Sequence, residues 1–238
     1  MDLIGIAFEV IATCNSDCSF CYNIWKEDET YPHGQLSFDK IKKLFDKVLP
    51  SVPTSSIYLT GGEPLLRKDL ERIVQYFVSK RLVVSVATNG VLLNESRARS
   101  LVNAGVSQFE ITLLSTDEKI HNRLSGNLAG YRKACEAILH IKKLKQQAYV
   151  GFTATKENIQ DAGDVMDLSF ALCADGLSIY RFVPTGKGLH NQELLMPSVS
   201  QINDALEILD DKSSQYKMDV FMGIPICTSL LRRKLRNI

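Results

Sequence analysis

The sequence predicts an α/β fold built on a parallel sheet, and three observations support this prediction. Strand-like and helix-like stretches alternate about six times along the 238 residues. The strand-like runs are short and mostly apolar on both faces, which is typical of strands covered by helices. No change in composition marks a linker along the chain. This order of elements fits either an open doubly wound sheet or a barrel, complete or partial.

In the first half of the chain, apolar and β-branched residues predict strands at 3–13, 56–60, 82–87 and 108–114. Ser37 is a suitable N-cap for a helix over 37–49, in which Ile41, Phe45 and Val48 recur at helical spacing. The same spacing predicts a helix over 68–80, and Asn94 is placed to begin the next one. The sequence Thr88-Asn89-Gly90 is typical of the turn that ends a strand.

The second half of the chain continues the alternation. Helices are expected over 131–144 and 159–173, and a further helix begins at Pro197-Ser198 and runs to about residue 209. Strands are expected at 148–155, 177–183 and 218–222. Residues 117–121, which include His121, are interpreted as a loop after the fourth strand. The four histidines, His33, His121, His140 and His190, are isolated and show no metal-ligand spacing.

The charge balance and the N-terminus exclude several classes of function. Lys plus Arg number 28 and Asp plus Glu number 27, so the net charge of +1 gives no footprint for nucleic acid or an anionic membrane. No apolar run approaches the ~20 residues that span a bilayer. Met1-Asp2-Leu3 lacks the basic start of a signal peptide. We therefore expect a cytoplasmic protein whose cysteines are reduced.

The six cysteines are unevenly distributed. Cys14, Cys18 and Cys21 lie close together in the pattern C-x3-C-x2-C, directly after the first predicted strand. Three thiolates on one loop can bind three irons of a [4Fe–4S] cluster, whereas a structural zinc site would need a fourth ligand such as His33. Cys135 and Cys173 are scattered and are expected to pack as small hydrophobic residues.

Further polar motifs follow the other predicted strands. In Thr60-Gly61-Gly62-Glu63-Pro64, the glycines allow a ligand to approach the backbone and Glu63 can bind an ammonium group. Thr88 and Asn89 follow the third strand, and Thr112 and Ser115 follow the fourth. Ligands of parallel α/β proteins bind at the carboxyl ends of the strands. We therefore expect these residues to face one pocket.

Taken together, these motifs resemble the radical S-adenosylmethionine (SAM) superfamily, over residues 4 to 185 approximately. The resemblance implies a partial (β/α)6 TIM-type barrel. It implies that Cys14, Cys18 and Cys21 hold a [4Fe–4S] cluster, and that Gly62 and Glu63 contact the methionine amino group of SAM. The implied activity is reductive cleavage of SAM to a 5′-deoxyadenosyl radical, which abstracts hydrogen from a substrate.

The resemblance also suggests contacts to the rest of SAM. Phe20 matches the aromatic residue that borders the adenine, and Val183 matches a backbone contact to it. Thr88 and either Thr112 or Ser115 would complete the binding site, the last two toward the carboxylate or ribose. The motif after the fifth strand departs from the family pattern, with Thr153 in place of Ile and Asn158 in place of Glu, which puts that adenine contact in doubt.

The end of the sequence resembles the branch that carries a SPASM or Twitch extension, which includes peptide maturases and enzymes of haem or molybdenum-cofactor biosynthesis. On this resemblance, residues 1–215 form the core and residues 216–238 a C-terminal tail that is either a remnant or the start of such an extension. Cys227 in this tail has no second cysteine to share a cluster. A peptide or small-molecule substrate and a flavodoxin- or ferredoxin-type electron donor are expected. Two alternatives are a SAM-binding protein without catalysis and a structural zinc protein.

Overall fold

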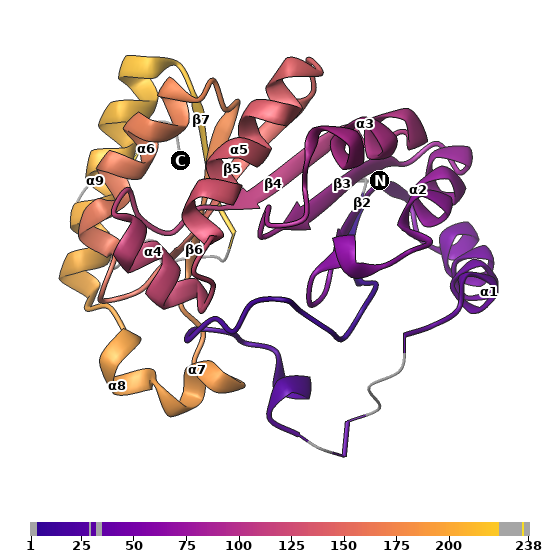
Figure 1. Cartoon of the computed structure of the whole chain (residues 1–238), viewed down its shortest axis with the longest axis horizontal. Coiled ribbons are helices and arrows are strands. Elements are labelled where there is room, and N and C mark those ends of the chain that lie inside the picture. Colours follow the sequence, from indigo (N-terminus) through magenta and orange to yellow (C-terminus); the bar gives the residue numbers. More distant parts are fainter. Residues whose placement is uncertain (1–3, 29, 32–34, 224–234, 236–238) are drawn as a thin grey trace.

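A seven-stranded, fully parallel sheet forms the centre of the molecule (Figure 1). The computed structural model describes residues 4–28, 30–31, 35–223 and 235. The strands lie side by side in chain order. They are β1 (Ile4–Glu9), β2 (Thr54–Thr60), β3 (Val83–Thr88), β4 (Gln108–Thr112), β5 (Gln147–Ala154), β6 (Gly176–Arg181) and β7 (Asp219–Met222).

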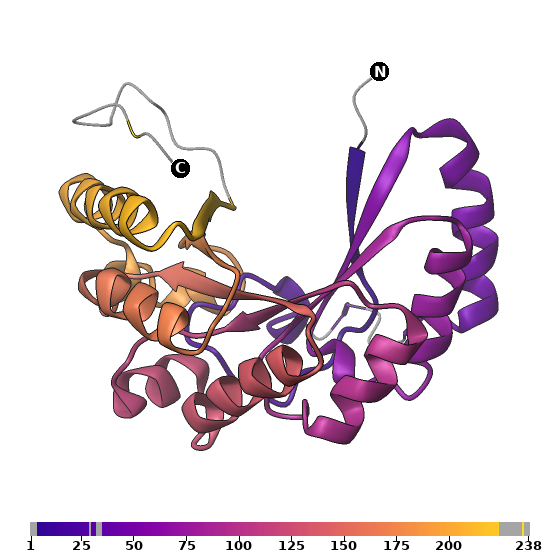
Figure 2. The same cartoon turned by 90° about the horizontal axis from the view of Figure 1, so that it is seen from above.

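Helices connect the strands and cover the outer side of the sheet (Figure 2). The sheet curves into an open half-barrel, with its edge strands β1 and β7 on opposite sides of the opening. The predicted partial barrel is therefore confirmed. The helices are α1 (Phe38–Val48), α2 (Leu70–Ser79), α3 (Glu95–Ala104), α4 (Glu118–Ser125), α5 (Gly130–Lys143), α6 (Ala162–Ala171), α7 (Lys187–His190), α8 (Gln192–Leu195) and α9 (Val199–Tyr216).

The hydrophobic core lies between the sheet and the helices. Phe45 of α1, Phe77 of α2 and Ile141 of α5 are buried there, as are the outward-facing strand residues Val84 and Phe109. This burial follows from the helical spacing of apolar residues seen in the sequence. Ser37 caps α1 as predicted, because its side chain accepts a hydrogen bond from the Lys40 backbone N–H. The core fixes the strands and leaves their carboxyl ends free to carry a site.

The structure differs from the sequence-based expectation at two places. Residues 118–125 form α4, so His121 lies on a helix and not in a loop. Helix α9 continues to Tyr216, well beyond residue 209. Strand β7 pairs with β6, so the strand expected at 218–222 is present and forms an edge of the sheet. Cys227 lies outside the described residues.

The described helices include none that is both long enough and apolar enough to cross a membrane.

Candidate active site

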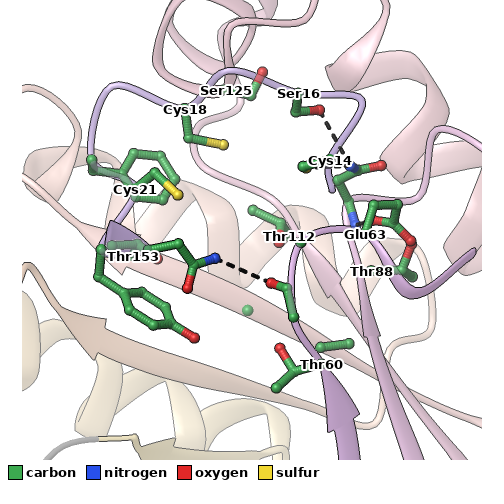
Figure 3. Close-up of a pocket in the computed structure, with 18 of the residues that line it drawn as sticks. Cys14, Ser16, Cys18, Cys21, Thr60, Glu63, Thr88, Thr112, Ser125 and Thr153 are labelled. Carbon is green, nitrogen blue, oxygen red and sulfur yellow. Dashed lines mark hydrogen bonds between the residues drawn. The ribbon is translucent and has the colours of Figure 1, made fainter. Parts of the chain in front are cut away.

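A cavity of about 350 Å³ lies at the carboxyl ends of the strands and reaches into the barrel interior. The polar motifs from several separate loops and strands meet in its wall, as expected (Figure 3). The predicted site residues that line the cavity are Cys14, Cys18, Phe20, Cys21, Gly62, Glu63, Thr88, Thr112 and Val183.

The loop after β1 carries the three cysteines across the top of the cavity. Cys14, Cys18 and Cys21 are free thiols, each half-buried, and the sulfurs of Cys18 and Cys21 turn toward the space beneath the loop (Figure 3). The Cys21 backbone N–H donates to the Cys18 carbonyl at 3.2 Å, which makes a tight turn. The Asn89 side-chain amide lies 3.9 Å from Cys14 Sγ and donates to Asn15 Oδ1 at 2.7 Å.

A segment after β6 holds the cysteine loop from the other side. The Gly188 N–H donates to the Cys21 carbonyl at 3.0 Å. The Thr185 hydroxyl donates to the Tyr22 carbonyl at 2.9 Å, and the Asn191 amide donates to the Ser19 carbonyl at 2.8 Å. Lys187 forms an ion pair with Asp17 in the same loop. We call residues 185–191 the clasp, because their contacts order a loop that contains no helix or strand.

The Gly61-Gly62-Glu63-Pro64 motif packs directly against the segment before the cysteines. The N–H groups of Gly62 and Glu63 donate to the carbonyls of Ile11 and Thr13, each at 2.8 Å. A Cβ at Gly62 would lie 2.0 Å from the Thr13 carbonyl oxygen. Only glycine permits this approach, so the residue serves the contact between two loops as well as the cavity wall.

Glu63 is a buried carboxylate at the wall of the cavity, with 1% of its surface exposed. Its oxygens accept hydrogen bonds from the Thr88 hydroxyl at 2.8 Å, the Asn89 N–H at 2.9 Å and the Leu65 N–H at 3.1 Å. Burial raises the pKa of Glu63 to about 7, although the three hydrogen bonds lower it. A carboxylate in this setting gains from a cationic ligand, because the cation offsets the cost of burying the charge.

Strand β4 provides one of the two residues predicted at its end. Thr112 lines the cavity, whereas Ser115 is fully buried elsewhere and donates to Asp161 Oδ2 at 2.5 Å. Phe20 packs against a small apolar cluster that includes Leu124 and Phe182. Val183 lies on the same side of the cavity as Phe20, because a Cβ at Gly188 would lie 3.2 Å from the Val183 carbonyl oxygen and 3.3 Å from that of Phe20.

Buried side chains behind the site fix its loops. Arg67 donates to the Val10 carbonyl at 2.7 Å and the Leu36 carbonyl at 2.9 Å, and it pairs with Asp69 at 2.8 Å. Asn158, expected at a doubtful adenine contact, is fully buried, and its amide donates to the carbonyls of Leu114 and Thr153. It therefore has a structural role in this chain.

His121 lines the cavity from α4, and its Nδ1 accepts a hydrogen bond from the Leu114 N–H at 3.1 Å. Burial lowers the pKa of His121 to about 4, so the imidazole is neutral near pH 7.

The two cysteines expected to pack as hydrophobic residues differ. Cys135 contacts the core, whereas Cys173 is exposed, because it occupies the left-handed position after α6 with φ of 60°.

The cavity also contains polar residues that the sequence motifs did not reveal. Tyr58, Glu110 and Tyr180 project into the barrel interior from β2, β4 and β6. Lys26 lies nearer the cysteine loop, where its Nζ donates to the Ser16 carbonyl at 2.8 Å. Alternation of inward and outward residues along each strand was the signal that could have found the first three.

Comparison with known proteins identifies the family. The sequence matches the radical SAM superfamily over residues 8–169, which is more than half of the chain. The chain belongs to the radical SAM superfamily. The resemblance inferred from the cysteine and glycine motifs is thereby confirmed.

The similar curated radical SAM proteins include two with different named activities. PqqA peptide cyclase from Bradyrhizobium diazoefficiens is 25% identical over 214 residues, which cover 90% of this chain and 56% of that protein. AdoMet-dependent heme synthase from Methanosarcina barkeri is 29% identical over 189 residues, which cover 79% of this chain and 53% of that protein. The chain thus spans about half the length of these relatives.

Solved structures agree with the radical SAM fold. Streptococcus suis SuiB bound to S-adenosylmethionine has a TM-score of 0.76 at 14% identity, covering 94% of this chain and 51% of SuiB. The protein anSMEcpe with bound AdoMet has a TM-score of 0.72 at 18% identity, covering 93% of this chain and 64% of that one. At these identities the likeness concerns the fold alone.

The cysteine loop fits the [4Fe–4S] cluster that the radical SAM family implies. Burial raises the pKa of Cys18 to about 12, and the nearby thiols of Cys21 and Cys14 add to the rise. A cationic metal centre offsets the burial of the Cys18 thiolate and its repulsion from the neighbouring thiolates, since the metal replaces the protons on the sulfurs. The described residues include no group of three or more His, Cys, Asp or Glu placed to hold a single metal ion. His33 lies outside them.

Proposed function

We propose that this chain is the catalytic core of a radical SAM enzyme that binds a [4Fe–4S] cluster through Cys14, Cys18 and Cys21. The observation that carries the proposal is that these three thiols and the buried carboxylate of Glu63 face one cavity at the strand ends. When bound and reduced, the cluster supplies the electron that cleaves SAM to methionine and a 5′-deoxyadenosyl radical, the species that abstracts hydrogen.

The protein's own residues would bind and orient SAM. The side-chain carboxylate of Glu63 binds the methionine ammonium group. The Thr88 hydroxyl and the Asn89 N–H donate hydrogen bonds to Glu63 and hold that carboxylate in place. Phe20 and Val183 line the side of the cavity that we assign to the adenine. Thr112 ends β4, which lies between β2, the strand before Glu63, and β6, the strand before Val183. Ser115 takes no part, because it is hydrogen-bonded to Asp161 outside the cavity.

The substrate is proposed to be a peptide or a cofactor precursor. The names of the relatives support both choices, since one is a cyclase of a peptide and another a synthase of haem. A crystal structure of SuiB with its precursor peptide SuiA shows the same fold with a TM-score of 0.73 at 14% identity. A flavodoxin- or ferredoxin-type protein would supply the electron.

The decisive experiment is anaerobic reconstitution of the protein with iron and sulfide, followed by dithionite and SAM. We expect a brown [4Fe–4S] chromophore and release of 5′-deoxyadenosine. Cys18→Ala removes one of three ligands and is expected to lose the cluster, whereas Cys173→Ala, at an exposed thiol far from the loop in sequence, keeps it. Stoichiometric zinc without iron, or a cluster-loaded protein that forms no 5′-deoxyadenosine, would contradict the proposal.

A further inference from the structure

Three side chains from alternate strands converge in the barrel interior. Tyr58 Oη donates to Glu110 Oε1 at 2.6 Å, and Tyr180 Oη lies 2.8 Å from each carboxylate oxygen of Glu110. The neighbouring strands β1, β3 and β5 present small residues to the cavity at Ala7, Ala87 and Gly151. A Cβ at Gly151 would lie 3.0 Å from Glu110 Oε1, so glycine makes room for the carboxylate. The interior is thus built around one acidic group.

Glu110 has no cationic partner within the described structure. None of the ion pairs among the described residues includes it. The cations that line the cavity are Lys26, which is bound to the Ser16 carbonyl, and Arg181 at the end of β6. The two tyrosine hydroxyls stay protonated and available as donors, because burial and the nearby Glu110 carboxylate raise the pKa of both.

The carboxylate of Glu110 retains acceptor capacity that the two tyrosines do not use. A carboxylate offers about four acceptor positions, whereas each tyrosine has one proton to donate: Tyr58 donates to Oε1, and Tyr180 shares its proton between the two oxygens of Glu110. A half-buried charge of this kind gains most from a charge-assisted hydrogen bond to a cation. The uncharged tyrosine hydroxyls orient the carboxylate but do not neutralise it.

We propose that Glu110 is the recognition site for a positively charged nitrogen group of the substrate, an ammonium or a guanidinium. Glu110 lies two residues before Thr112 on β4 and faces the same cavity. Two residues of strand correspond to about 6.5 Å. A group bound at Glu110 therefore lies about that distance further into the barrel interior than a group bound at Thr112. The inference rests on the proposed function to the extent that SAM occupies the level of Thr112, with the substrate beneath it.

The test measures binding, because binding does not depend on the cluster. The probe is a lysine blocked at both backbone ends, compared by calorimetry at low ionic strength with its Nε-acetylated, uncharged form. An arginine probe separates the guanidinium from the ammonium. We expect the charged probes to bind at least about ten-fold more tightly than the acetylated probe, and Glu110→Gln to weaken them roughly 10- to 100-fold.

Two further variants separate recognition from a structural role. Gly151→Ala keeps the charge but places a methyl group against Glu110 Oε1, and it is expected to weaken the charged probes in the same direction. Glu193→Gln, at an exposed acid outside the cavity lining, is expected to bind them as the wild type does. Thermal melting establishes that each variant is folded.

The inference is overturned if the wild type shows no preference for the charged probes, or if folded Glu110→Gln and Gly151→Ala bind them as the wild type does. The second result would mean that the tyrosine–glutamate contacts only tie β2, β4 and β6 together. Failure of the proposed function would show separately, as a reconstituted wild type that forms no 5′-deoxyadenosine. The two sets of measurements are independent.

Discussion

Because the Glu63 carboxyl is buried, we expect the stability of the fold to fall as the pH rises and the binding of a cationic ligand to improve. Its pKa of about 7 lies above the usual value of 4.5, so the folded state prefers the protonated carboxyl. This contribution to stability is complete below pH 4.5 and is lost as the pH rises through about 7. Replacing Glu63 by Gln removes the titration, so the metal-free variant is expected to lack this loss.

The size of the effect follows from the shift. A rise from 4.5 to about 7 corresponds to about 3 kcal/mol in total, and about 2.5 kcal/mol of it is lost between pH 5 and pH 8. Glu63→Gln also brings an amide N–H close to the N–H donors of Leu65 and Asn89, a cost that does not depend on pH. Comparing the two proteins at both pH values cancels this cost.

The assay is urea unfolding of metal-free wild type and Glu63→Gln at pH 5 and pH 8. The titration of His121 is common to both proteins and cancels in the difference. We expect the unfolding free energy of the wild type to fall by about 2.5 kcal/mol relative to the variant over this range. The variant is also expected to lose SAM binding, because a neutral amide binds an ammonium weakly. Identical pH dependence in the two proteins would refute this reasoning.

Three further predictions concern the surroundings of the site. As the pH falls from 6.5 to 4, His121→Asn should gain about 3 kcal/mol of unfolding free energy relative to the wild type, because the pKa of buried His121 is lowered to about 4 and the titration of Glu63 is common to both proteins; urea unfolding measures the difference, and an identical pH dependence of the two proteins argues against it. Gly62→Ala, whose methyl group would meet the Thr13 carbonyl at 2.0 Å, should lower the melting temperature and the iron bound per chain after reconstitution, and normal iron content would contradict this. Arg67→Met removes a buried guanidinium and leaves the carbonyls of Val10 and Leu36 without its hydrogen bonds, so it should cost about 1–3 kcal/mol of unfolding free energy for each acceptor left unpaired. Arg72→Met, at a side chain 63% exposed, should change it by less than about 1 kcal/mol.

The fold and the top of the site were predictable because their signals are local. The cysteine spacing and the Gly-Gly-Glu-Pro motif each lie within eight residues or fewer, directly after an apolar strand. Parallel strands place such segments at one edge of the sheet whatever the exact register. Helix α4 was missed because its apolar residues are few, although Asp117 caps its start and Gly126 ends it in the left-handed conformation.

The meeting of the three side chains in the barrel interior was not predictable, for a different reason. Tyr58 and Tyr180 reach Glu110 across 52 and 70 residues of sequence. Whether they meet depends on the register of three strands, and a shift of one residue would turn each side chain to the opposite face. The same holds for Ser115, because its hydroxyl is committed to Asp161, 46 residues later in the chain.

The clasp over the cysteine loop has a consequence for how the protein is made. Its hydrogen bonds and ion pair join Tyr22, Asp17 and Ser19 to partners 163, 170 and 172 residues downstream. On the ribosome the three thiols emerge early, and most of the chain must be translated before these partners exist. Metal loading of an ordered site therefore follows the synthesis of β6 and α7. During that interval an oxidant can join neighbouring thiols into a disulfide, and the nascent chain would then leave the ribosome without a usable ligand set.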